Sequence, residues 1–325
     1  MDLKEFLDQW TDASDRLLVH TSGSTGRPKP LWVEKHRMEA SARITCRFLG
    51  LQAGNTALLC LPLDYIAGKM MVVRALTCGL EMICTEPDGH PLADIDDAIS
   101  FAAMIPMQVY NSLQVPAERE RLRQIRQLII GGGAVDDALA AELRSFPNAV
   151  WSTYGMTETL SHIALRRLSG PAASEWYTPF ESVSVSQNED GCLVIDAPLV
   201  CPERLVTNDL AEIRDGRFRI LGRRDNVVCS GGIKIQIEEV ERLLGRHLQA
   251  PFCVTKQNDR RLGEAVVLLT VSDDLEMIEK LCQEHLPEKY WRPRRVLHVD
   301  RIPLTATGKV ARKEAERLAA LAVEI

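Results

Sequence analysis

The sequence has no excess of basic residues, no long hydrophobic run and few aromatic side chains. Of its 325 residues, 39 are Lys or Arg and 45 are Asp or Glu, so the formal net charge is −6 at pH 7. This balance excludes a strongly basic nucleic-acid-binding protein. No segment approaches the roughly 18 consecutive apolar residues of a membrane helix, which excludes a membrane-spanning protein. The remaining class is a soluble globular protein.

The nine cysteines lack the pattern of a disulfide or zinc framework. Their number is odd, and none forms a Cys-x-x-Cys pair or stands near a His at zinc-finger spacing. Cys60 and Cys84 lie in apolar segments, where we expect buried thiols. The first residues also lack an apolar signal region. We therefore expect a reducing, cytoplasmic location.

The pattern from Leu17 to Leu205 predicts alternating strands and helices. Short apolar runs alternate with segments of helical period, separated by Gly, Pro and Asp. Strands are expected at 58–61, 81–84, 99–104, 127–130 and 149–153, and helices at 34–49 and 136–145. The first helix carries an apolar stripe of Met38, Ala42, Thr45 and Leu49. This arrangement favours an α/β domain whose helices pack on a sheet.

After Gly191 the predicted elements become shorter and change order. Strands at 192–195, 212–214 and 218–221 indicate a small β unit. Beyond them we expect a helix at 237–248, a strand at 265–271, a helix at 275–286, a strand at 295–299 and a helix from Lys309. A boundary near Asp225 divides the chain into residues 1–224 and a smaller α+β domain of residues 225–325.

A cluster of hydroxyls, glycines and a lysine directly follows the apolar residues 17–19. Gly23 and Gly26 allow the backbone to approach an anion closely. The surrounding donors are Thr21, Ser22, Ser24, Thr25 and Lys29. The spacing does not match a Walker loop, so these residues alone are compatible with either a phosphate cradle or a flexible Ser/Gly linker.

Two further loops follow expected strands, at the end of the sheet where open α/β proteins bind ligands. The first contains Gly131, Gly132 and Gly133, and the second contains Tyr154, Gly155, Thr157 and Glu158. The second loop brings together a ring that could stack on a base and a carboxylate that could hold magnesium. A tight turn and a loop with a buried tyrosine are the alternatives.

Three later segments place polar groups at loop positions. They cover residues 207–209, 222–225 and 303–309. Asp209 could accept from both hydroxyls of a ribose, Arg223 could hold ribose or phosphate, and Lys309 follows a glycine. Each segment taken singly is equally compatible with a surface turn.

Taken together and in this order, these segments resemble the acyl-adenylate-forming superfamily of acyl- and aryl-CoA synthetases, adenylation domains and luciferases. The resemblance spans residues 20 to about 313 and rests on the phosphate loop and on residues 154–158, 222–225 and 303–309. It implies a large N-terminal α/β adenylation core with a small β unit, followed by a mobile C-terminal lid. It also implies an AMP-forming ligase that uses ATP, Mg²⁺, coenzyme A and a small carboxylic acid.

The resemblance assigns a role to each motif. Residues 21–29 would cover the β- and γ-phosphates, residues 131–133 and Tyr154 would flank adenine and the acyl group, and Asp225 would be the hinge. The catalytic set would be Thr157 near the α-phosphate, Glu158 on magnesium and Lys309 between the acid and the α-phosphate. Ribose would be bound by Asp209 and Arg223. The pantetheine arm would pass Ser230, Gly231 and Gly232 in the thioester-forming step.

The sequence departs from the family pattern around the acid pocket and at its front. Tyr65 replaces a histidine of the acyl-pocket motif, and the phosphate loop begins about twenty residues from Met1, so we expect a compact form without the front subdomain. Such short synthetases resemble the o-succinylbenzoate:CoA ligases of menaquinone biosynthesis. Groups available for a second carboxylate are Lys69, Arg74, Ser161 and His162.

Several alternatives stay open at this stage. Lys69 and Arg74 are equally compatible with a solvated helix face. Another small aryl- or acyl-CoA ligase would share the same chemistry, and a noncatalytic nucleotide-binding module would share the fold. The sequence allows a homo-oligomer, or a second subunit that completes the front of the core, without requiring either.

Overall fold

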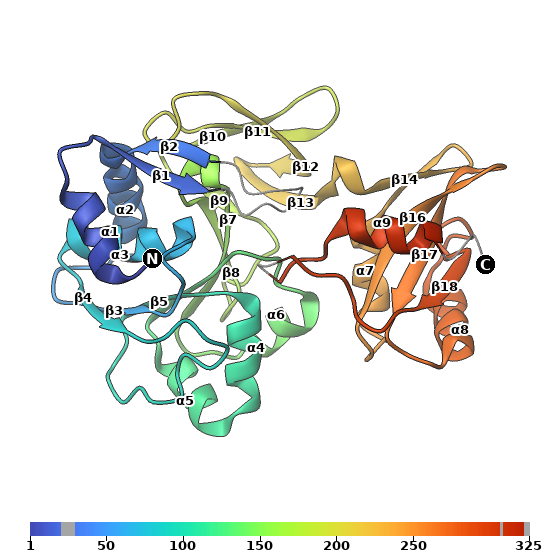
Figure 1. Ribbon diagram of the computed structural model, residues 1–325, viewed down its shortest axis with the longest axis horizontal. Helices are drawn as coiled ribbons and strands as arrows, with labels where there is room; N and C mark the ends of the chain where they lie inside the picture. The colour runs from blue at the N-terminus through green and yellow to red at the C-terminus, as the bar shows by residue number, and fades with distance from the viewer. Residues whose placement is uncertain (21–29, 306–307, 322–325) are drawn as a thin grey trace.

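The computed structural model describes residues 1–20, 30–305 and 308–321, which form a large and a small lobe (Figure 1). The N-terminus lies in the large lobe, and the last described helix, α9 (Arg312–Leu321), lies in the small lobe. Buried apolar clusters of the large lobe draw on residues between Phe6 and Phe218, and those of the small lobe on residues between Val228 and Ala319. The mixed α/β architecture confirms the predicted fold class, while the functional division at residue 225 stays a prediction.

A seven-stranded sheet forms the centre of the large lobe. Its strands in spatial order are β4 (Glu81–Cys84), β3 (Thr56–Leu59), β5 (Phe101–Met104), β6 (Gln127–Ile130), β7 (Ala149–Gly155), β8 (His162–Arg167) and β9 (Thr178–Pro179). The first five strands are parallel, β8 runs antiparallel to β7, and β9 runs antiparallel to β8. The carboxyl ends of β6 and β7 therefore lie side by side, and the loops that follow them meet there.

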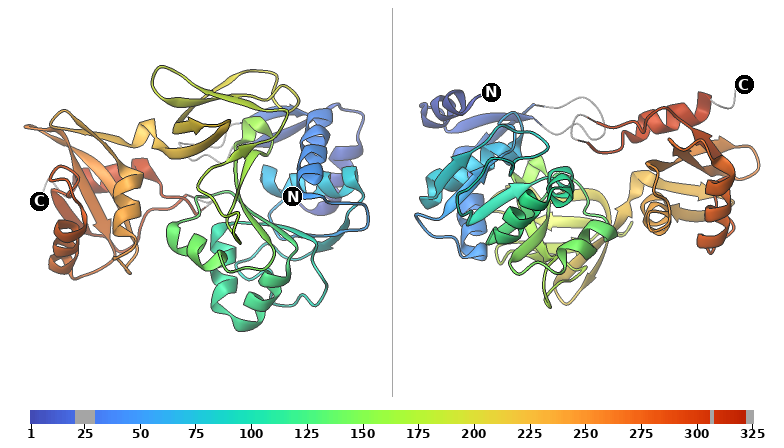
Figure 2. Two further views of the ribbon diagram at one scale, coloured as in Figure 1. Left: turned by 180° about the vertical axis from the view of Figure 1, so that it is seen from behind. Right: turned by 90° about the horizontal axis from the view of Figure 1, so that it is seen from below.

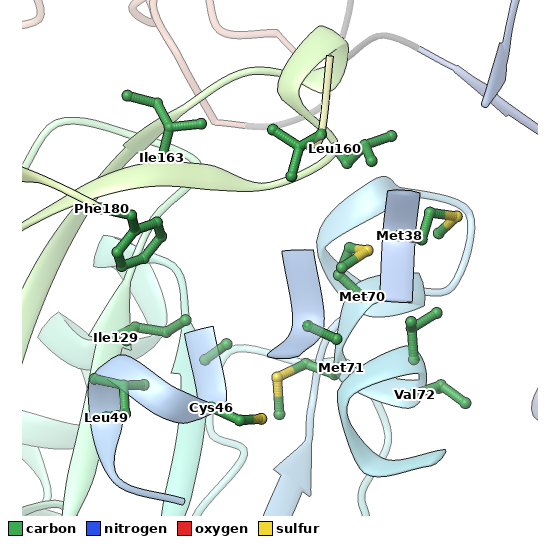
Figure 3. Close-up of a cluster of buried hydrophobic side chains, with 14 of the residues drawn as sticks. Met38, Cys46, Leu49, Met70, Met71, Val72, Ile129, Leu160, Ile163 and Phe180 are labelled. Atoms are coloured by element: carbon green, nitrogen blue, oxygen red, sulfur yellow. The ribbon is translucent and has the colours of Figure 1, made fainter. Parts of the chain in front are cut away.

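Alternate residues of each strand face opposite sides of this sheet. On β3, Ala57 and Leu59 join the cluster beneath α2 (Lys35–Leu49) and α3 (Ile66–Cys78), and Leu58 joins the other. The second cluster is covered by α4 (Pro106–Gln114), α5 (Pro116–Gln124) and α6 (Asp137–Leu143). Figure 3 shows Met70 and Met71 of α3 in the first cluster.

The predicted stripe on the first long helix is confirmed. Met38, Ala42, Thr45 and Leu49 of α2 are all buried, and Gly50 ends the helix in the left-handed conformation.

The expectation for the cysteines holds only in part. All nine lie within the described residues and are free thiols, and Cys60 is buried. The prediction that Cys84 is buried is wrong, because β4 is the edge strand of the sheet and leaves this side chain exposed. Among the described residues, no helix combines the length and apolar character needed to cross a membrane.

The rest of the large lobe surrounds the sheet. Helix α1 (Leu3–Thr11) precedes a hairpin of β1 (Arg16–His20) and β2 (Pro30–Glu34). The predicted small β unit is a four-stranded antiparallel sheet of β10 (Ser184–Gln187), β11 (Cys192–Asp196), β12 (Leu205–Arg214) and β13 (Arg217–Arg223). A short 3₁₀ turn, η2 (Arg224–Asn226), links β13 to the small lobe.

The small lobe is a five-stranded sheet between helices (Figure 2). Its elements are β14 (Val227–Ser230), β15 (Ile233–Gln236), α7 (Ile237–Leu244), β16 (Phe252–Asp259), β17 (Gly263–Thr270), α8 (Leu275–His285), β18 (Arg295–His298) and α9 (Arg312–Leu321). Helices α7 and α8 pack on one face and α9 on the other.

The prediction that the last helix begins at Lys309 is wrong by three residues, because Lys309 belongs to a turn. The N–H of Thr305 donates to the carbonyl of Lys309 at 2.7 Å, and Leu304 pairs with Val310 in a β-bridge. Gly308 has a φ of 77°, which the turn requires and which favours glycine.

Candidate active site

A chain of hydrogen bonds joins three of the predicted nucleotide-binding residues. The hydroxyl of Tyr154, near the end of β7, donates to Oδ2 of Asp209 at 2.6 Å. Arg223 donates from Nη1 to Oδ1 of Asp209 and from Nη2 to Oδ2 of Asp225, each at 3.0 Å. Residues from β7, β12 and the end of β13 thus meet at one place, which the predicted shared role would require.

Tyr154 is held by aromatic packing on its other sides. Its ring lies edge-on to Phe218, with centroids 5.1 Å apart, and tilted against Tyr177 at 5.8 Å. Burial and the neighbouring Asp209 carboxylate raise the pKa of Tyr154 above its ordinary value. The phenol therefore stays protonated and acts as a fixed donor.

Lys309 approaches this group from the small lobe. The segment before α9 extends from the small lobe toward the large one (Figure 1). Burial lowers the pKa of Lys309, the positive charge of Arg223 lowers it further, and the carboxylate of Asp209 acts in the opposite direction. The structure therefore brings the predicted catalytic lysine within electrostatic reach of the predicted ribose site.

Two glycines are required by close contacts around the loops that follow β6 and β7. A Cβ on Gly155 would lie 2.2 Å from the carbonyl oxygen of Ser161, and one on Gly131 would lie 2.4 Å from the hydroxyl of Thr153. Gly132 has a φ of 79°, and Gly133 follows it along the loop. The positions of Gly131 and Gly155 are packed too tightly for a larger residue, which explains why glycine stands there.

Thr157 and Glu158 begin the 3₁₀ turn η1 (Thr157–Thr159), which directly follows β7. Thr157 is buried, whereas Glu158 is exposed and, among the described residues, its carboxylate has no hydrogen bond or ion pair. Within the same part of the chain, no group of three or more His, Cys, Asp or Glu side chains could hold a metal ion. One unpaired carboxylate fits Mg²⁺, which commonly binds one or two carboxylates together with phosphate oxygens and water.

Arg74, Ser161 and His162 of the predicted acid pocket lie together. Arg74, on α3, donates from Nη2 to the hydroxyl of Ser161 at 2.6 Å. His162 lies between Thr45 and Ser161, with its two ring nitrogens 3.2 Å from their hydroxyl oxygens. The solvated-helix interpretation of Arg74 is wrong, because only 2% of this residue is exposed.

The guanidinium of Arg74 has no opposite charge beside it in the described part of the chain. Its Nε is buried without a hydrogen-bond partner there, and Nη1 has only a 3.9 Å contact with the sulfur of Met71. Burial lowers the pKa of Arg74 to about 10, an effect that Cys46 and Cys78 partly oppose. Burial, and then the charge of Arg74, lower the pKa of His162, so its imidazole is neutral.

Lys69 and Tyr65 occupy other positions on the same helix. Lys69 is also buried, but its ammonium lies 3.2 Å from the sulfur of Met1 and 5.6 Å from the ring centre of Phe6. Tyr65 is the half-buried residue that caps the N-terminus of α3. These contacts place Lys69 against α1 rather than in the group around Arg74.

The predicted pantetheine contact lies entirely in the small lobe. Ser230 is buried at the end of β14, and Gly231 donates from its N–H to the carbonyl of Leu262 at 2.8 Å. A Cβ on Gly231 would lie 3.2 Å from the ring of Tyr290, whereas one on Gly232 would meet nothing within 4 Å. Residues 21–29, the predicted phosphate loop, lie outside the described residues.

Comparison with known proteins identifies the family of this chain. The sequence profile of the AMP-binding enzyme family matches residues 5–191, more than half of the chain. The chain belongs to the AMP-binding enzyme family. The resemblance inferred from the motifs is thereby confirmed.

Individual relatives support the same family. The chain is 23% identical to a 2-succinylbenzoate–CoA ligase of Listeria monocytogenes, over 95% of this chain and 71% of the relative. It is 30% identical to the enzyme of that name from Salmonella typhimurium, over 76% of this chain but only 56% of the relative. An acyl-CoA synthetase (AMP-forming)/AMP-acid ligase II-like protein of Dyadobacter fermentans is 34% identical, covers 97% of this chain and 92% of its own, and has a TM-score of 0.65.

Sequence reasoning missed the aromatic support of the candidate site around Tyr154. Tyr177 and Phe218 stack at 5.4 Å beside Tyr154 and are joined by reciprocal backbone hydrogen bonds. They stand 41 positions apart in segments with no motif of their own. Their pairing depends on tertiary structure, so the only available signal was their membership in a small set of aromatic residues.

Proposed function

We propose that this chain is an AMP-forming acid–CoA ligase whose acid is o-succinylbenzoate. The observation that carries the proposal is the buried guanidinium of Arg74, which has no carboxylate partner among the described residues. Arg74 bonds to Ser161, whose carbonyl closely approaches Gly155 beside Tyr154. A dicarboxylic acid could therefore place one carboxylate at Arg74 and the other toward the nucleotide. Relatives named 2-succinylbenzoate–CoA ligases support this choice.

The first step makes the acid reactive. An oxygen of its carboxylate attacks the α-phosphorus of ATP, the bond from that phosphorus to the pyrophosphate oxygen breaks, and acyl-AMP and pyrophosphate result. Two anions meet in this step, so fixed positive charge and hydrogen-bond donors lower the barrier. In our proposal Lys309 supplies that charge, Thr157 donates to the α-phosphate and Asp209 orients the ribose. A magnesium ion held by Glu158 would neutralise phosphate charge.

The second step transfers the acyl group to coenzyme A. The thiol sulfur bonds to the acyl carbon, the bond from that carbon to the AMP oxygen breaks, and the thiol proton is released. We propose that residues 1–224 act as the adenylation core and that residues 225–325 act as a lid that carries Lys309 and the glycine turn at Gly231 and Gly232. The lid has to move between the two steps, because Lys309 serves the active site in the first step and the glycine turn serves it in the second.

A cationic cavity beside the glycine turn supports coenzyme A as the acceptor. Its volume is about 310 Å³, and its lining includes the three cations Lys289, Arg292 and Arg294, together with Tyr290 and one acidic residue, Glu279. Tyr290 also lies beside the turn, since a Cβ on Gly231 would be 3.2 Å from its ring. Arginine and lysine bind phosphate groups, so this cavity suits the phosphates of coenzyme A.

We expect the Gly232→Trp variant to separate the two steps. Gly232 has open space around its Cβ position, so an indole there would extend into the proposed path of the pantetheine arm. Pyrophosphate release with acid and ATP should stay within about twofold of wild type, while thioester formation should fall by at least about tenfold. Because Gly232 has a φ of 84°, Gly232→Ala is the control for backbone strain alone. Equal loss of both activities in the tryptophan variant would contradict the assignment.

The substrate assignment is tested with a panel of acids. Pyrophosphate release would be followed with ATP, magnesium and coenzyme A, and the thioester would be identified by mass. The panel contains o-succinylbenzoate, substituted benzoates and short fatty acids. We expect o-succinylbenzoate to have the highest kcat/KM. Preference for another acid would overturn the substrate but keep the reaction, and inactivity with every acid would favour a noncatalytic module.

We also propose that the reaction takes place in the cytoplasm. Nine free thiols, of which Cys84 and Cys229 are exposed, suit a reducing compartment. Fractionation of cells that produce the native chain would test this location, and recovery outside the cytoplasm would overturn it.

A further inference from the structure

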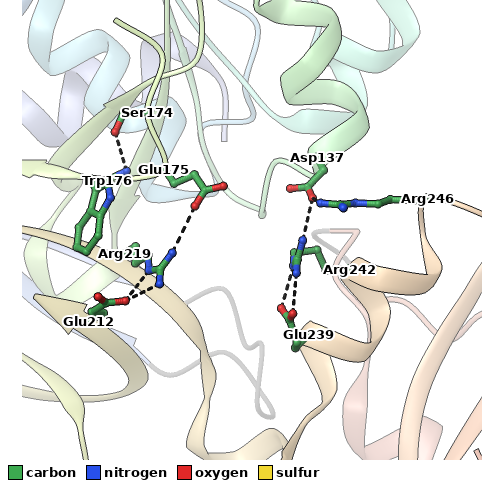
Figure 4. Close-up of polar contacts among 9 residues, drawn as sticks. All are labelled: Asp137, Ser174, Glu175, Trp176, Glu212, Arg219, Glu239, Arg242 and Arg246. Atoms are coloured by element: carbon green, nitrogen blue, oxygen red, sulfur yellow. Dashed lines mark hydrogen bonds and ion pairs between the residues drawn. The ribbon is translucent and has the colours of Figure 1, made fainter. Parts of the chain in front are cut away.

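Ion pairs that involve none of the predicted site residues connect the two lobes. Asp137 is the first residue of α6 in the large lobe, and its Oδ2 accepts from Arg246 at 2.6 Å and from Arg242 at 3.4 Å (Figure 4). Arg242 is on α7, and Arg246 lies two residues after the end of that helix in the small lobe. Arg242 is held in place by Glu239, which accepts from it at 2.6 and 2.8 Å. One carboxylate of the large lobe thus binds two guanidinium groups of the small lobe.

Helix α7 also connects to the segment that carries Lys309. Glu241, the neighbour of Arg242, accepts two hydrogen bonds from Arg312, each at 2.7 Å. Arg312 also donates to the carbonyl of Val254 at 2.8 Å and begins α9, three residues after Lys309. Helix α7 therefore joins the anchor of the Lys309 segment to the contact with Asp137.

We propose that Asp137, Arg242 and Arg246 form a latch that holds the small lobe where Lys309 faces Asp209 and Arg223. The consequence for the reaction rests on the proposed function. Asp137 is then a positioning residue for acyl-AMP formation, because it acts through the placement of Lys309. The latch has to open before the glycine turn can serve the second step.

The ion pairs of the latch are weak enough to break, because their side chains are exposed to solvent. The side chains of Asp137, Arg242 and Arg246 are 50%, 40% and 52% exposed. Exposed ion pairs contribute little individually and are screened by salt, so we expect loss of the latch to change rates by about threefold rather than by orders of magnitude. Such a contact biases an equilibrium between two arrangements without locking either.

The experiment compares the two half-reactions in the full-length chain. Asp137→Asn and Arg246→Gln should each slow acyl-AMP formation by about threefold at low salt. Thioester formation from supplied acyl-AMP should keep its rate or increase. The double variant should be no slower than Asp137→Asn alone, because that substitution already removes the contact with Arg246. Exchange of the charges in Asp137→Arg with Arg246→Asp should restore part of the lost rate.

A matched ion-pair network within the large lobe provides the control. Arg219 binds Glu175 at 3.5 Å and Glu212 at 2.6 Å, and Figure 4 draws this group together with the latch. Glu175→Gln removes a similar exposed carboxylate without affecting contact between the lobes. It should change neither half-reaction. Equal rates for Asp137→Asn and Glu175→Gln would overturn the latch.

A second measurement does not depend on activity. Small-angle X-ray scattering of the substrate-free chain should differ between Asp137→Asn and wild type at low salt, and high salt should shift wild type toward the variant. If wild type forms no acyl-AMP with any acid, the proposed function fails while a scattering difference still supports the latch. Identical scattering of wild type, Asp137→Asn and Glu175→Gln would overturn the latch even in an active enzyme.

Discussion

Replacement of Lys309 with alanine is expected to lower the rate of acyl-AMP formation by about 100- to 1,000-fold, the range typical for loss of one group that stabilises transition-state charge. The structure supports this expectation because Lys309 is within electrostatic reach of Asp209 and Arg223. Pyrophosphate release with o-succinylbenzoate measures the effect. Thioester formation from supplied acyl-AMP should be nearly unchanged, since that step uses another surface of the lid.

Lys313→Ala is the matched control for this variant. Lys313 is an exposed lysine on α9, four residues after Lys309, and should be replaceable without loss of activity. If Lys309→Ala forms acyl-AMP at the wild-type rate, the proposed mechanism is wrong.

The titration of Lys309 should determine how kcat/KM depends on pH. Burial lowers its pKa below 10.5, the ordinary value, and Arg223 acts in the same direction against Asp209. Only the protonated amine carries the charge that the first step needs, so kcat/KM should fall as the pH rises through this lowered pKa. The alkaline limb should therefore begin below pH 10.5 and be absent from the residual activity of Lys309→Ala. An unchanged limb in the variant would assign the titration to another group.

Much of the fold could be predicted from local patterns. The β4 and β6 strands have the predicted bounds, 81–84 and 127–130, because each contains a short apolar run that is bounded by polar or glycine residues. The exposure of Cys84 could not be predicted, since an apolar run does not reveal whether its strand lies at an edge. Similarly, Lys309 was expected in a helix because its turn depends on the pairing of Leu304 with Val310.

The candidate site was predictable as a set of motifs but not as a set of contacts. Tyr154, Asp209, Arg223 and Lys309 each stood in a recognisable segment, and the structure brings them together. The latch at Asp137 has no sequence signal, because its pairs join residues 105 and 109 positions apart on two lobes. Long-range ion pairs of this kind depend on how the lobes meet, which local sequence does not encode.

Replacement of Arg74 tests whether this residue selects the acid, and replacement of Lys69 is the matched control. Both are cations on α3, and each is only 2% exposed. Arg74 lies against Ser161, near the nucleotide loop, whereas Lys69 lies against Met1 and Phe6. If burial of a cation alone determined the choice of acid, replacement of Arg74 and replacement of Lys69 would change that choice equally. If Arg74 binds the second carboxylate, only its replacement will change the choice of acid.

We expect Arg74→Met to lower kcat/KM for o-succinylbenzoate by about 10- to 100-fold, which corresponds to loss of a hydrogen-bonded charge worth about 1.5–3 kcal/mol. The value for a simple benzoate, which lacks the second carboxylate, should change by less than about threefold. The folded state should not suffer, because replacement of a buried charge by an apolar side chain of similar size is often neutral or stabilising. Thermal unfolding would therefore show Tm unchanged or raised. Equal loss with both acids, or the same change of preference in Lys69→Met, would mean that Arg74 supports the fold and does not select the acid.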